Sequence, residues 1–381
     1  MTEAIDALNP TKKKRLLSLD VFRGLTLAFM ILVNDPGDWS HVYTPLDHAE
    51  WNGCTPTDLV FPSFLFMVGV AIVYAMESKK KAREGHGKII MHAFRRMITL
   101  ILITWVVQFI FRIWDSKTHS VSEVLAHLRF PGVLPRIAVV YFIATVIYLK
   151  TEQKTRDWIF AGVLIAYFLI MTLIPVPGVG AANLEPSTNL GAWLDRLIFG
   201  TNHLWGESKT WDPEGILGTI PALGTALFGI RVGSWLKRAD KEDATKVSWM
   251  FVYGLAAIAI GLFWNFFFPI NKKLWTSSYV LYAGGIATCI LAALYWIIDV
   301  QGKKWFSFPF VVFGINSIAT YVMADIVPEL MGKIWGGSIQ KNLFNQFFSP
   351  YNASLAGAMF TVLILWVVMW VFYRFKIIIK V

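Results

Sequence analysis

The chain has 381 residues, of which 56% are hydrophobic and only 16% are charged. A soluble domain carries about 25% charged residues, so this composition excludes an ordinary water-soluble fold and indicates a membrane protein. The formal net charge is +10, but the Lys and Arg residues occur in short clusters between apolar segments. This distribution argues against nucleic acid as a partner and is typical of loops that flank membrane spans.

Ten apolar segments follow one another along the chain, each about as long as the roughly 20 residues needed to cross a bilayer as a helix. They fall at 19–34, 58–77, 93–112, 133–149, 157–175, 215–236, 247–268, 278–298, 306–326 and 353–373. We therefore predict an all-α polytopic bundle of about ten transmembrane helices. The transmembrane domain covers residues 19–373, with a basic N-terminal tail over 1–18 and a short C-terminal tail over 374–381.

The first apolar segment follows a basic cluster at residues 12–15 and so also has the outline of a secretory signal. It contains Asp20 and Arg23, however, and ends at Asn34 without a small-residue cleavage site. We predict that it is kept as the first span, with Asp20 and Arg23 forming an ion pair one helical turn apart.

The charges between the spans predict the orientation of the bundle. With the basic N-terminus in the cytoplasm, 23 of the 35 Lys and Arg residues fall on the cytoplasmic side and ten on the other. This positive-inside balance predicts that both termini are cytoplasmic. The loops on the opposite face are longer and mix Trp, Gly, Pro, His and carboxylates, a composition that often marks functional sites on a rigid scaffold.

His48, in the first of these outer loops, is the leading candidate for chemistry because imidazole exchanges protons near neutral pH. Asp47 or Glu50 can orient its ring, while Trp51 and Asn52 provide an aromatic wall and an amide for a substrate. The alternative is a loop histidine that only forms hydrogen bonds. The other six histidines lack such neighbours in the sequence.

Asn34 and Asp58 flank the same outer loop, at the end of the first span and the start of the second. Asp58 can tune the site, or it can simply complement the dipole at the start of its helix. Asn34 can project its amide into the same pocket. We predict that both contribute to a site around His48.

Other polar residues lie where later spans meet the outer face: Arg136, Asp212, Glu214, Asn271 and Lys272. Structural roles are the alternative, with Arg136 as an interfacial arginine and the two carboxylates as favourable first-turn residues. Because the predicted topology puts all five on one face, we predict that they bind a substrate.

Several familiar mechanisms find no support in the sequence. There is no P-loop, dinucleotide fingerprint, HExxH zinc motif or GxSxG elbow. The two cysteines, Cys54 and Cys289, provide neither a disulfide framework nor a thiolate metal site. No metal is predicted.

Motifs in order over nearly the whole chain resemble the heparan-α-glucosaminide N-acetyltransferase family. They are RLLSLDVFRG (15–24), HAxWNG (48–53), DLVFP (58–62), PGVLxR (131–136), DPEGxLGT (212–219), NKxLWxxSY (271–279) and NSI (316–318). The chain resembles a bacterial member that lacks the extra N-terminal luminal domain and first span of the lysosomal enzyme.

The resemblance implies acetyl transfer from acetyl-CoA to the amine of a terminal glucosamine across the membrane. It implies that His48 is the active-site histidine, as a general base or as a transient acetyl carrier, and both routes stay open. Asn34 would polarise the thioester carbonyl and Asp58 would orient or tune the site. Asp212 and Glu214 would recognise the acceptor sugar.

Acetyl-CoA is made in the cytoplasm, so its thioester must reach the outward-facing His48 through the bundle. Arg95, Arg96 and Lys88 are candidates for the CoA phosphates, with membrane anchoring as the alternative role. Asn316, a buried amide within the ninth span that needs a partner, is a further candidate for the donor site.

A bacterial member would lie in the inner membrane among lipid and act on periplasmic amino sugars or cell-wall glycan fragments. A homodimer would fit the family. O-acetylation of a glycan is a close variant of the predicted reaction. A transporter of sugars or amino sugars is the alternative from another class, since polar groups within spans also mark permeation paths. The sequence has no evident internal repeat to favour it.

Overall fold

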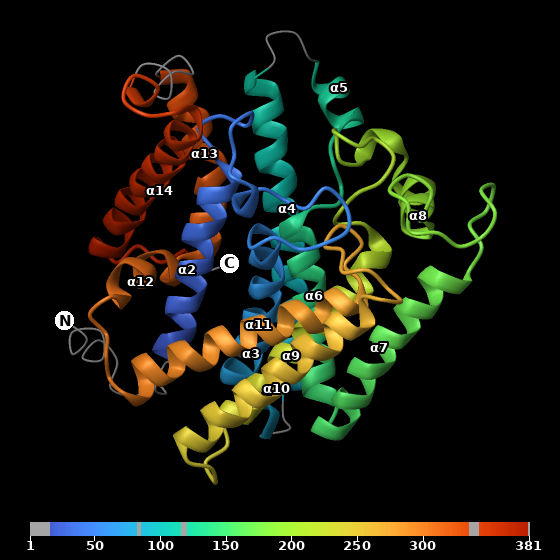
Figure 1. Ribbon diagram of the computed structural model, residues 1–381, viewed down its shortest axis with the longest axis vertical. Helices are drawn as coiled ribbons and strands as arrows, with labels where there is room; N and C mark the ends of the chain where they lie inside the picture. The colour runs from blue at the N-terminus through green and yellow to red at the C-terminus, as the bar shows by residue number, and fades with distance from the viewer. Residues whose placement is uncertain (1–15, 82–84, 116–119, 335–342, 380–381) are drawn as a thin grey trace.

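The computed structural model describes residues 16–81, 85–115, 120–334 and 343–379, and the membrane-spanning elements in it are all α-helical (Figure 1). Within these ranges nine helices are long and apolar enough to cross a membrane. They are α2 (Leu17–Asn34), α3 (Val60–Lys81, preceded by the 3-10 turn η2, Thr57–Leu59), α4 (His86–Asp115), α6 (Val133–Lys150), α7 (Gln153–Leu173), α9 (Ile216–Leu236), α10 (Asp243–Trp264), α11 (Ser277–Leu294, continued by the π-turn η4, Tyr295–Val300) and α14 (Pro350–Arg374).

The predicted all-α membrane bundle is therefore confirmed, while the cytoplasmic position of both termini stays a prediction. Most of the predicted N-terminal tail, residues 1–15, lies outside the described residues. Leu17 and Ser18, the last residues of that predicted tail, already belong to α2.

The predicted span 306–326 is not one continuous helix. It consists of α12 (Ser307–Ile315) and α13 (Ser317–Ile334), which meet at an angle of 88°. The break lies at Asn316, whose backbone leaves the helical region at φ −113° and ψ 47°. The pair can count as a tenth, bent span, which agrees with the predicted number of about ten spans. The prediction of one continuous helix over 306–326 was wrong.

Four short elements lie in the loops: η1 (Thr44–Leu46), α5 (Val121–Ala126), α8 (Leu190–Phe199) and η3 (Thr201–His203). Except for η1, they belong to the long loops between α4 and α6 and between α7 and α9. Figure 1 shows α5 and α8 beyond the upper ends of α6 and α7. These loops, with the one between α2 and α3, close one end of the bundle.

The core forms around α3, which packs closely against α9 and also contacts α2, α6 and α11. Glycines let two of these backbones approach: a Cβ on Gly69 would lie 2.0 Å from the Ala226 carbonyl oxygen, and one on Gly229 would lie 2.0 Å from that of Phe66. Small residues bring transmembrane helices together in this way because lipid provides no hydrophobic drive for their association.

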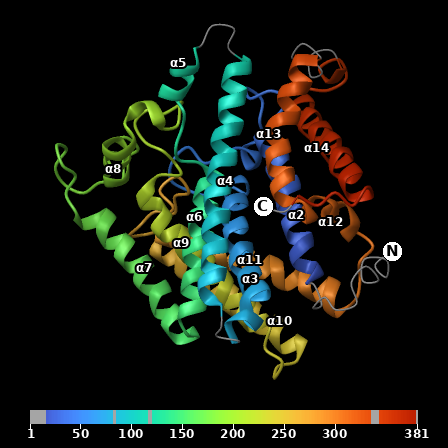
Figure 2. The same ribbon diagram turned by 180° about the vertical axis from the view of Figure 1, so that it is seen from behind.

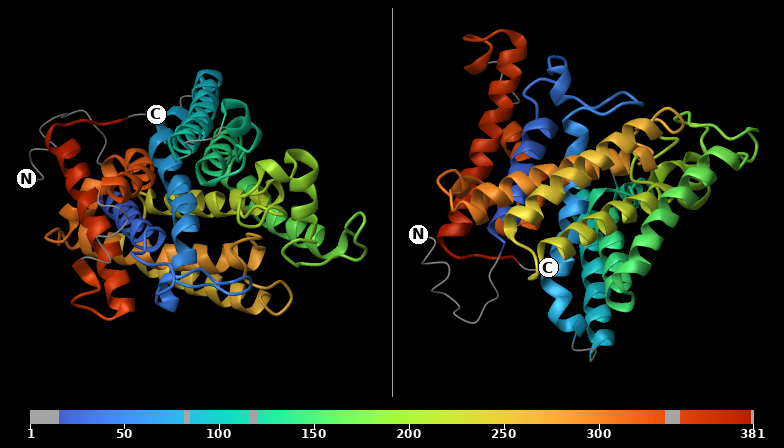
Figure 3. Two further views of the ribbon diagram at one scale, coloured as in Figure 1. Left: turned by 90° about the horizontal axis from the view of Figure 1, so that it is seen from above. Right: turned by 60° about the horizontal axis from the view of Figure 1, so that its bottom comes forward.

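The remaining helices surround this core in two groups. Figures 1 and 2 show α2, α12, α13 and α14 together on one side, and α6, α7 and α9 on the other. The view from above in Figure 3 shows the red C-terminal helices and the green α7–α8 region on opposite sides of the molecule. Residues of α2, α3, α4, α6 and α13 enclose the space described next.

Candidate active site

A cavity of about 970 Å³ runs along α3. Both Thr57, just before α3, and Lys79, near its end, line the cavity. Because they are separated by 22 residues of nearly continuous helix, the cavity extends for about 33 Å. The hydrocarbon core of a bilayer is about 30 Å thick, so the cavity is long enough to reach across it.

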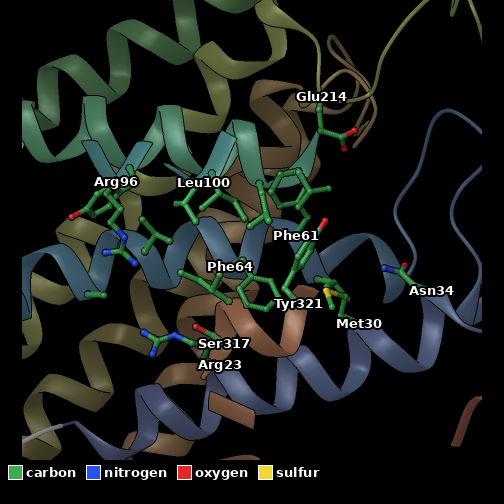
Figure 4. Close-up of a pocket in the computed structure, with 18 of the residues that line it drawn as sticks. Arg23, Met30, Asn34, Phe61, Phe64, Arg96, Leu100, Glu214, Ser317 and Tyr321 are labelled. Carbon is green, nitrogen blue, oxygen red and sulfur yellow. The ribbon is translucent and has the colours of Figure 1, made fainter. Parts of the chain in front are cut away.

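The two ends of the cavity differ in chemistry. We name the first the histidine end, which is lined by Asn34, His48, Thr57, Arg129, Trp205, Glu214 and Lys272. We name the second the basic end, which is lined by Lys79, His92 and Arg96. Figure 4 shows Asn34 and Glu214 on the right, Arg96 and Arg23 towards the left, and aromatic and aliphatic side chains between them.

At the histidine end, His48 is paired with Asp58. The His48 Nδ1 atom lies 2.7 Å from Oδ1 of Asp58. The other carboxylate oxygen accepts the backbone N–H groups of Ala49, at 3.1 Å, and Thr55, at 3.0 Å. These bonds fold the loop that carries His48 back onto the start of α3. The sequence placed Asp58 near the site, and the structure gives it the orienting position first assigned to Asp47 or Glu50.

A second loop, residues 269–276, carries Lys272 to the histidine. The Gly53 N–H donates to the Ile270 carbonyl oxygen at 2.7 Å, and the Asn271 Nδ2 atom donates to the side-chain Oδ1 of Asn52 at 3.2 Å. The Lys272 Nζ atom consequently lies 3.2 Å from Nδ1 and 3.3 Å from Nε2 of His48.

Lys272 is largely buried, with an 18% exposed side chain, and its Nζ atom lies 3.8 Å from Oδ1 of Asp58. Burial lowers the pKa of Lys272, an effect opposed by the negative charges of Asp58 and Glu214. A cation with a lowered pKa beside an imidazole is a frequent feature of reactive sites.

Arg129, which the sequence reasoning missed, organises the two carboxylates predicted to bind the acceptor. Its Nε donates to Oδ2 of Asp212 at 2.8 Å, while its Nη2 reaches Oδ1 of Asp212 at 2.6 Å and Oε2 of Glu214 at 2.5 Å. Burial opposes the charge of Arg129, but these carboxylates hold its pKa above its ordinary value. Asp212 is enclosed by these bonds, and of the two carboxylates Glu214 alone lines the cavity.

Several predicted substrate residues support the site from behind instead of lining the cavity. The Arg136 Nη2 donates to the Gly215 carbonyl oxygen at 2.8 Å, and its guanidinium lies over the Trp275 ring. Asn271 is fully buried and caps its own loop by accepting the Leu274 N–H at 2.8 Å. Trp51 and Asn52, likewise, do not line the cavity.

Of the residues predicted to bind the CoA phosphates, one lines the cavity and two do not. Arg96 lines the cavity, with its guanidinium 4.8 Å from the centre of the Tyr141 ring. Its Nε is buried and has no hydrogen-bond partner among the described residues. Arg95 and Lys88 are exposed and do not line the cavity, whereas Lys79 and His92, which were not predicted, do.

Asn316 has a different role from the predicted contact with a donor. Its Nδ2 donates to the Ile377 carbonyl oxygen at 2.8 Å, and its Oδ1 accepts the Ile379 N–H at 3.1 Å. The amide therefore clamps the C-terminal segment. Ile378 and Ile379 of that segment line the cavity, so the clamp shapes its wall.

One histidine set aside in the sequence also has a carboxylate partner. The His41 Nδ1 atom lies 2.6 Å from Oδ2 of Asp38, and that hydrogen bond lowers the pKa of Asp38. Both side chains are exposed, at 38% and 41%, and neither lines the cavity. Pairing with an aspartate thus does not distinguish His48, but its position in the cavity does.

The histidine end can perform proton transfer or nucleophilic attack. A carboxylate at Nδ1 favours the tautomer that carries the proton there and makes Nε2 the proton acceptor, with the Lys272 Nζ atom 3.3 Å away. No group of three or more His, Cys, Asp or Glu side chains in the described part of the chain could hold a metal ion. The reactive groups found here are the imidazole, the lysine and the carboxylates.

Comparison with known proteins gives a consistent family. The family model described as "Heparan-alpha-glucosaminide N-acetyltransferase, catalytic" matches residues 15–262. The human protein named heparan-alpha-glucosaminide N-acetyltransferase is 30% identical over 383 residues, covering 88% of this chain and 56% of the human protein. The mouse protein of the same name is 30% identical over 370 residues, covering 84% of this chain and 55% of its own length. The chain thus spans about half the length of these relatives.

Proposed function

Because the chain belongs to the heparan-α-glucosaminide N-acetyltransferase family, we propose that it transfers an acetyl group from acetyl-CoA to the amine of a glucosamine-type sugar, with His48 at the reacting centre. The observation that carries this proposal is the cavity that joins His48 at one end to Lys79, His92 and Arg96 at the other. Such a cavity suits a donor that enters from one side of a membrane and an acceptor that arrives from the other.

The donor would lie along the cavity. Lys79, His92 and Arg96 would bind its phosphates by charge-assisted hydrogen bonds, and the Nε atom of Arg96, which has no hydrogen-bond partner among the described residues, is available for one. The apolar middle, with Phe61 and Phe64, suits the uncharged arm of CoA. The thioester would then lie beside His48, with the Asn34 amide polarising its carbonyl.

Two routes of transfer fit this arrangement. In the direct route Nε2 of His48 accepts a proton from the sugar ammonium, and the amine attacks the thioester carbon. The C–S bond breaks, the proton that the new amide nitrogen loses goes to the departing sulfur, and CoA leaves as its thiol. In the two-step route Nε2 itself attacks the thioester carbon, the C–S bond breaks and CoA leaves as its thiolate. The deprotonated amine then attacks the acetyl group on Nε2, the bond from Nε2 to the acetyl carbon breaks, and the proton that the nitrogen loses returns to Nε2. Lys272 would stabilise the negative oxygen that forms on the acetyl carbon in either route.

The acceptor would bind at the histidine end, and Glu214 would hold its ammonium group. We place that end on the periplasmic side of a bacterial inner membrane, since the basic end carries the cluster of Lys and Arg residues typical of cytoplasmic loops. Asp212 and Arg129 would fix Glu214 without touching the sugar.

Purified full-length protein in proteoliposomes, given labelled acetyl-CoA and glucosamine, tests this proposal. We expect His48→Ala to lower the rate by at least about 100-fold, the usual scale for loss of acid–base catalysis. His41→Ala, which changes a similarly exposed histidine outside the cavity, is the matched control and should keep its rate. Acetyl-CoA binding without acetylation of any amino sugar or glycan would refute the enzyme, and O-acetylated product would identify the variant reaction.

The same cavity also favours a second function, because a path between two ends can carry a solute. Uptake of unmodified sugar into the proteoliposomes, unaffected by His48→Ala, would identify a transporter. Labelling without an acceptor separates the two acetyl routes: acetyl on the peptide that contains His48 supports the carrier route, and unlabelled protein supports direct transfer.

A further inference from the structure

Three tryptophans from two loops, Trp51 from one and Trp205 and Trp211 from the other, form a row of edge-to-face contacts. The ring centres of Trp51 and Trp211 lie 5.1 Å apart, and those of Trp211 and Trp205 lie 5.3 Å apart. The Trp51 indole N–H donates to the Leu184 carbonyl oxygen at 2.9 Å, which fixes one end of the row. The other end, Trp205, lines the cavity at the histidine end.

The loop from Trp205 to Trp211 is closed by its own hydrogen bonds. The Trp205 carbonyl oxygen accepts the N–H groups of Ser208, at 3.2 Å, and Lys209, at 2.9 Å. The Ser208 hydroxyl donates to the Trp211 carbonyl oxygen. The Trp205 ring is therefore held in place before any ligand arrives, which lowers the entropy lost on binding.

Charges of both signs surround this row. Lys273 lies over the Trp211 ring, with its Nζ 5.7 Å from the ring centre, and donates to the Glu50 carbonyl oxygen at 2.6 Å. Burial lowers the pKa of Lys273, while the carboxylates of Glu207 and Asp47 interact with its charge. Asp47, Glu50 and Glu207 are exposed around the row, and two of the cations that line the cavity there, Arg129 and Lys272, already face carboxylates, so an uncharged ring fits these charges better than a sulfated one.

We propose that Trp205 binds the second sugar ring of the acceptor, an unsulfated ring to which the reacting glucosamine is joined. This inference rests on the proposed function, because it assumes an amino sugar beside His48 and Glu214. One face of a pyranose ring consists mainly of C–H groups and packs on an aromatic face, while its hydroxyls stay with polar groups and water. The preferred acceptor is thus a short unsulfated glycan and not free glucosamine.

The test compares a glucosamine disaccharide, its sulfated form and free glucosamine as acceptors for full-length protein with acetyl-CoA. We expect Trp205→Ala to raise KM for the disaccharide about tenfold, the effect of losing about 1.4 kcal/mol, and to change KM for glucosamine less than about twofold. Trp205→Tyr keeps an aromatic face and should restore most of the affinity. Trp305→Ala, at an 86% exposed tryptophan, is the control.

Binding is measured separately as quenching of tryptophan fluorescence by the disaccharide in His48→Ala protein. Equal KM changes for both acceptors, or tighter use of the sulfated disaccharide, would overturn the assignment of Trp205. If no amino sugar is acetylated, the proposed function fails, and the fluorescence result alone then decides the subsite. Quenching that occurs in His48→Ala and is lost in His48→Ala/Trp205→Ala supports the subsite. Quenching that is unchanged in the double variant, or absent already in His48→Ala, refutes it.

Discussion

The Nδ1 atom of His48 lies 2.7 Å from a carboxylate oxygen of Asp58, and the two side chains differ sharply in exposure, at 38% and 2%. The buried partner can therefore orient the ring without competing for substrate. The exposed partner presents its second nitrogen at the cavity, beside the Lys272 Nζ atom. The buried carboxylate and the accessible imidazole are therefore suited to separate roles, one that orients and one that reacts.

Replacing Asp58 by Asn should lower kcat by about 100-fold or more, because a neutral amide does not stabilise the imidazolium that forms during proton transfer. KM for the sugar should change little, since Asp58 is shielded from the cavity by His48. Steady-state kinetics on full-length protein measures both constants. Asp38→Asn, which changes the partner of His41, is the control, and an equal loss of kcat in that variant would contradict the prediction.

Replacing Lys272 by Arg should extend activity to higher pH. A lysine is charged below its pKa, and burial lowers the pKa of Lys272, so activity that needs this charge falls as the pH rises through that value. Arginine keeps its charge throughout, and the alkaline decline of kcat/KM should move upward. Lys272→Met should be slow at every pH. An unchanged alkaline limb in Lys272→Arg would exclude Lys272 as its source.

Replacing Arg129 by Met should destabilise the protein by about 3–5 kcal/mol, because the buried Asp212 carboxylate would lose its charge partner. Arg129→Lys should recover only part of this, since an ammonium lacks the planar fork that binds two oxygens of one carboxylate. Thermal unfolding in detergent is the measurement. Arg238→Met, which breaks an exposed pair with Asp240, is the control and should leave the unfolding temperature nearly unchanged.

Replacing Ala71 by Trp should block acetyl transfer by filling the cavity midway along α3. The disaccharide should still bind at the histidine end, because its proposed contacts lie at the far end of the helix. Transfer and fluorescence binding assays on the same preparation separate these effects. Val252→Trp, on an exposed position of α10, is the control. Normal transfer in Ala71→Trp would show that the donor takes another path.

Replacing Asn316 by Ala should release the C-terminal segment, since two hydrogen bonds worth about 1 kcal/mol each would be lost. Carboxypeptidase digestion followed by mass spectrometry should then remove residues beyond Ile377 faster than in the unmodified protein. Asn183→Ala, which changes a loop amide far along the chain, is the control. Equal digestion rates would show that other contacts hold the segment.

The membrane-spanning helices could be predicted from the sequence because each one is a long run of mostly apolar residues. Counting the spans predicts the side of the membrane on which each loop lies, because successive helices cross in opposite directions. That count was enough to group Asn34, His48, Glu214 and Lys272 at one end. The break at Asn316 did not follow, because the residues on both sides are apolar and the amide's partners lie about 60 residues later in the chain.

Arg129 was missed for a related reason. Nothing near it in the chain distinguishes it from other interfacial arginines, and its partners Asp212 and Glu214 lie more than 80 residues away. Proximity to a carboxylate in sequence likewise favoured Asp47 and Glu50 over Asp58 as the partner of His48. Only the folding of the loop onto α3 brings Asp58 to the ring.

The cavity along α3 also bears on the electrical insulation of the membrane. A water-filled path of this length would let protons leak down their gradient and drain the energy that the cell stores there. Phe61, Phe64 and Leu100 line its middle (Figure 4), and apolar walls disfavour the entry of water and ions. The walls that suit the uncharged arm of the proposed donor therefore also oppose the passage of ions along the cavity.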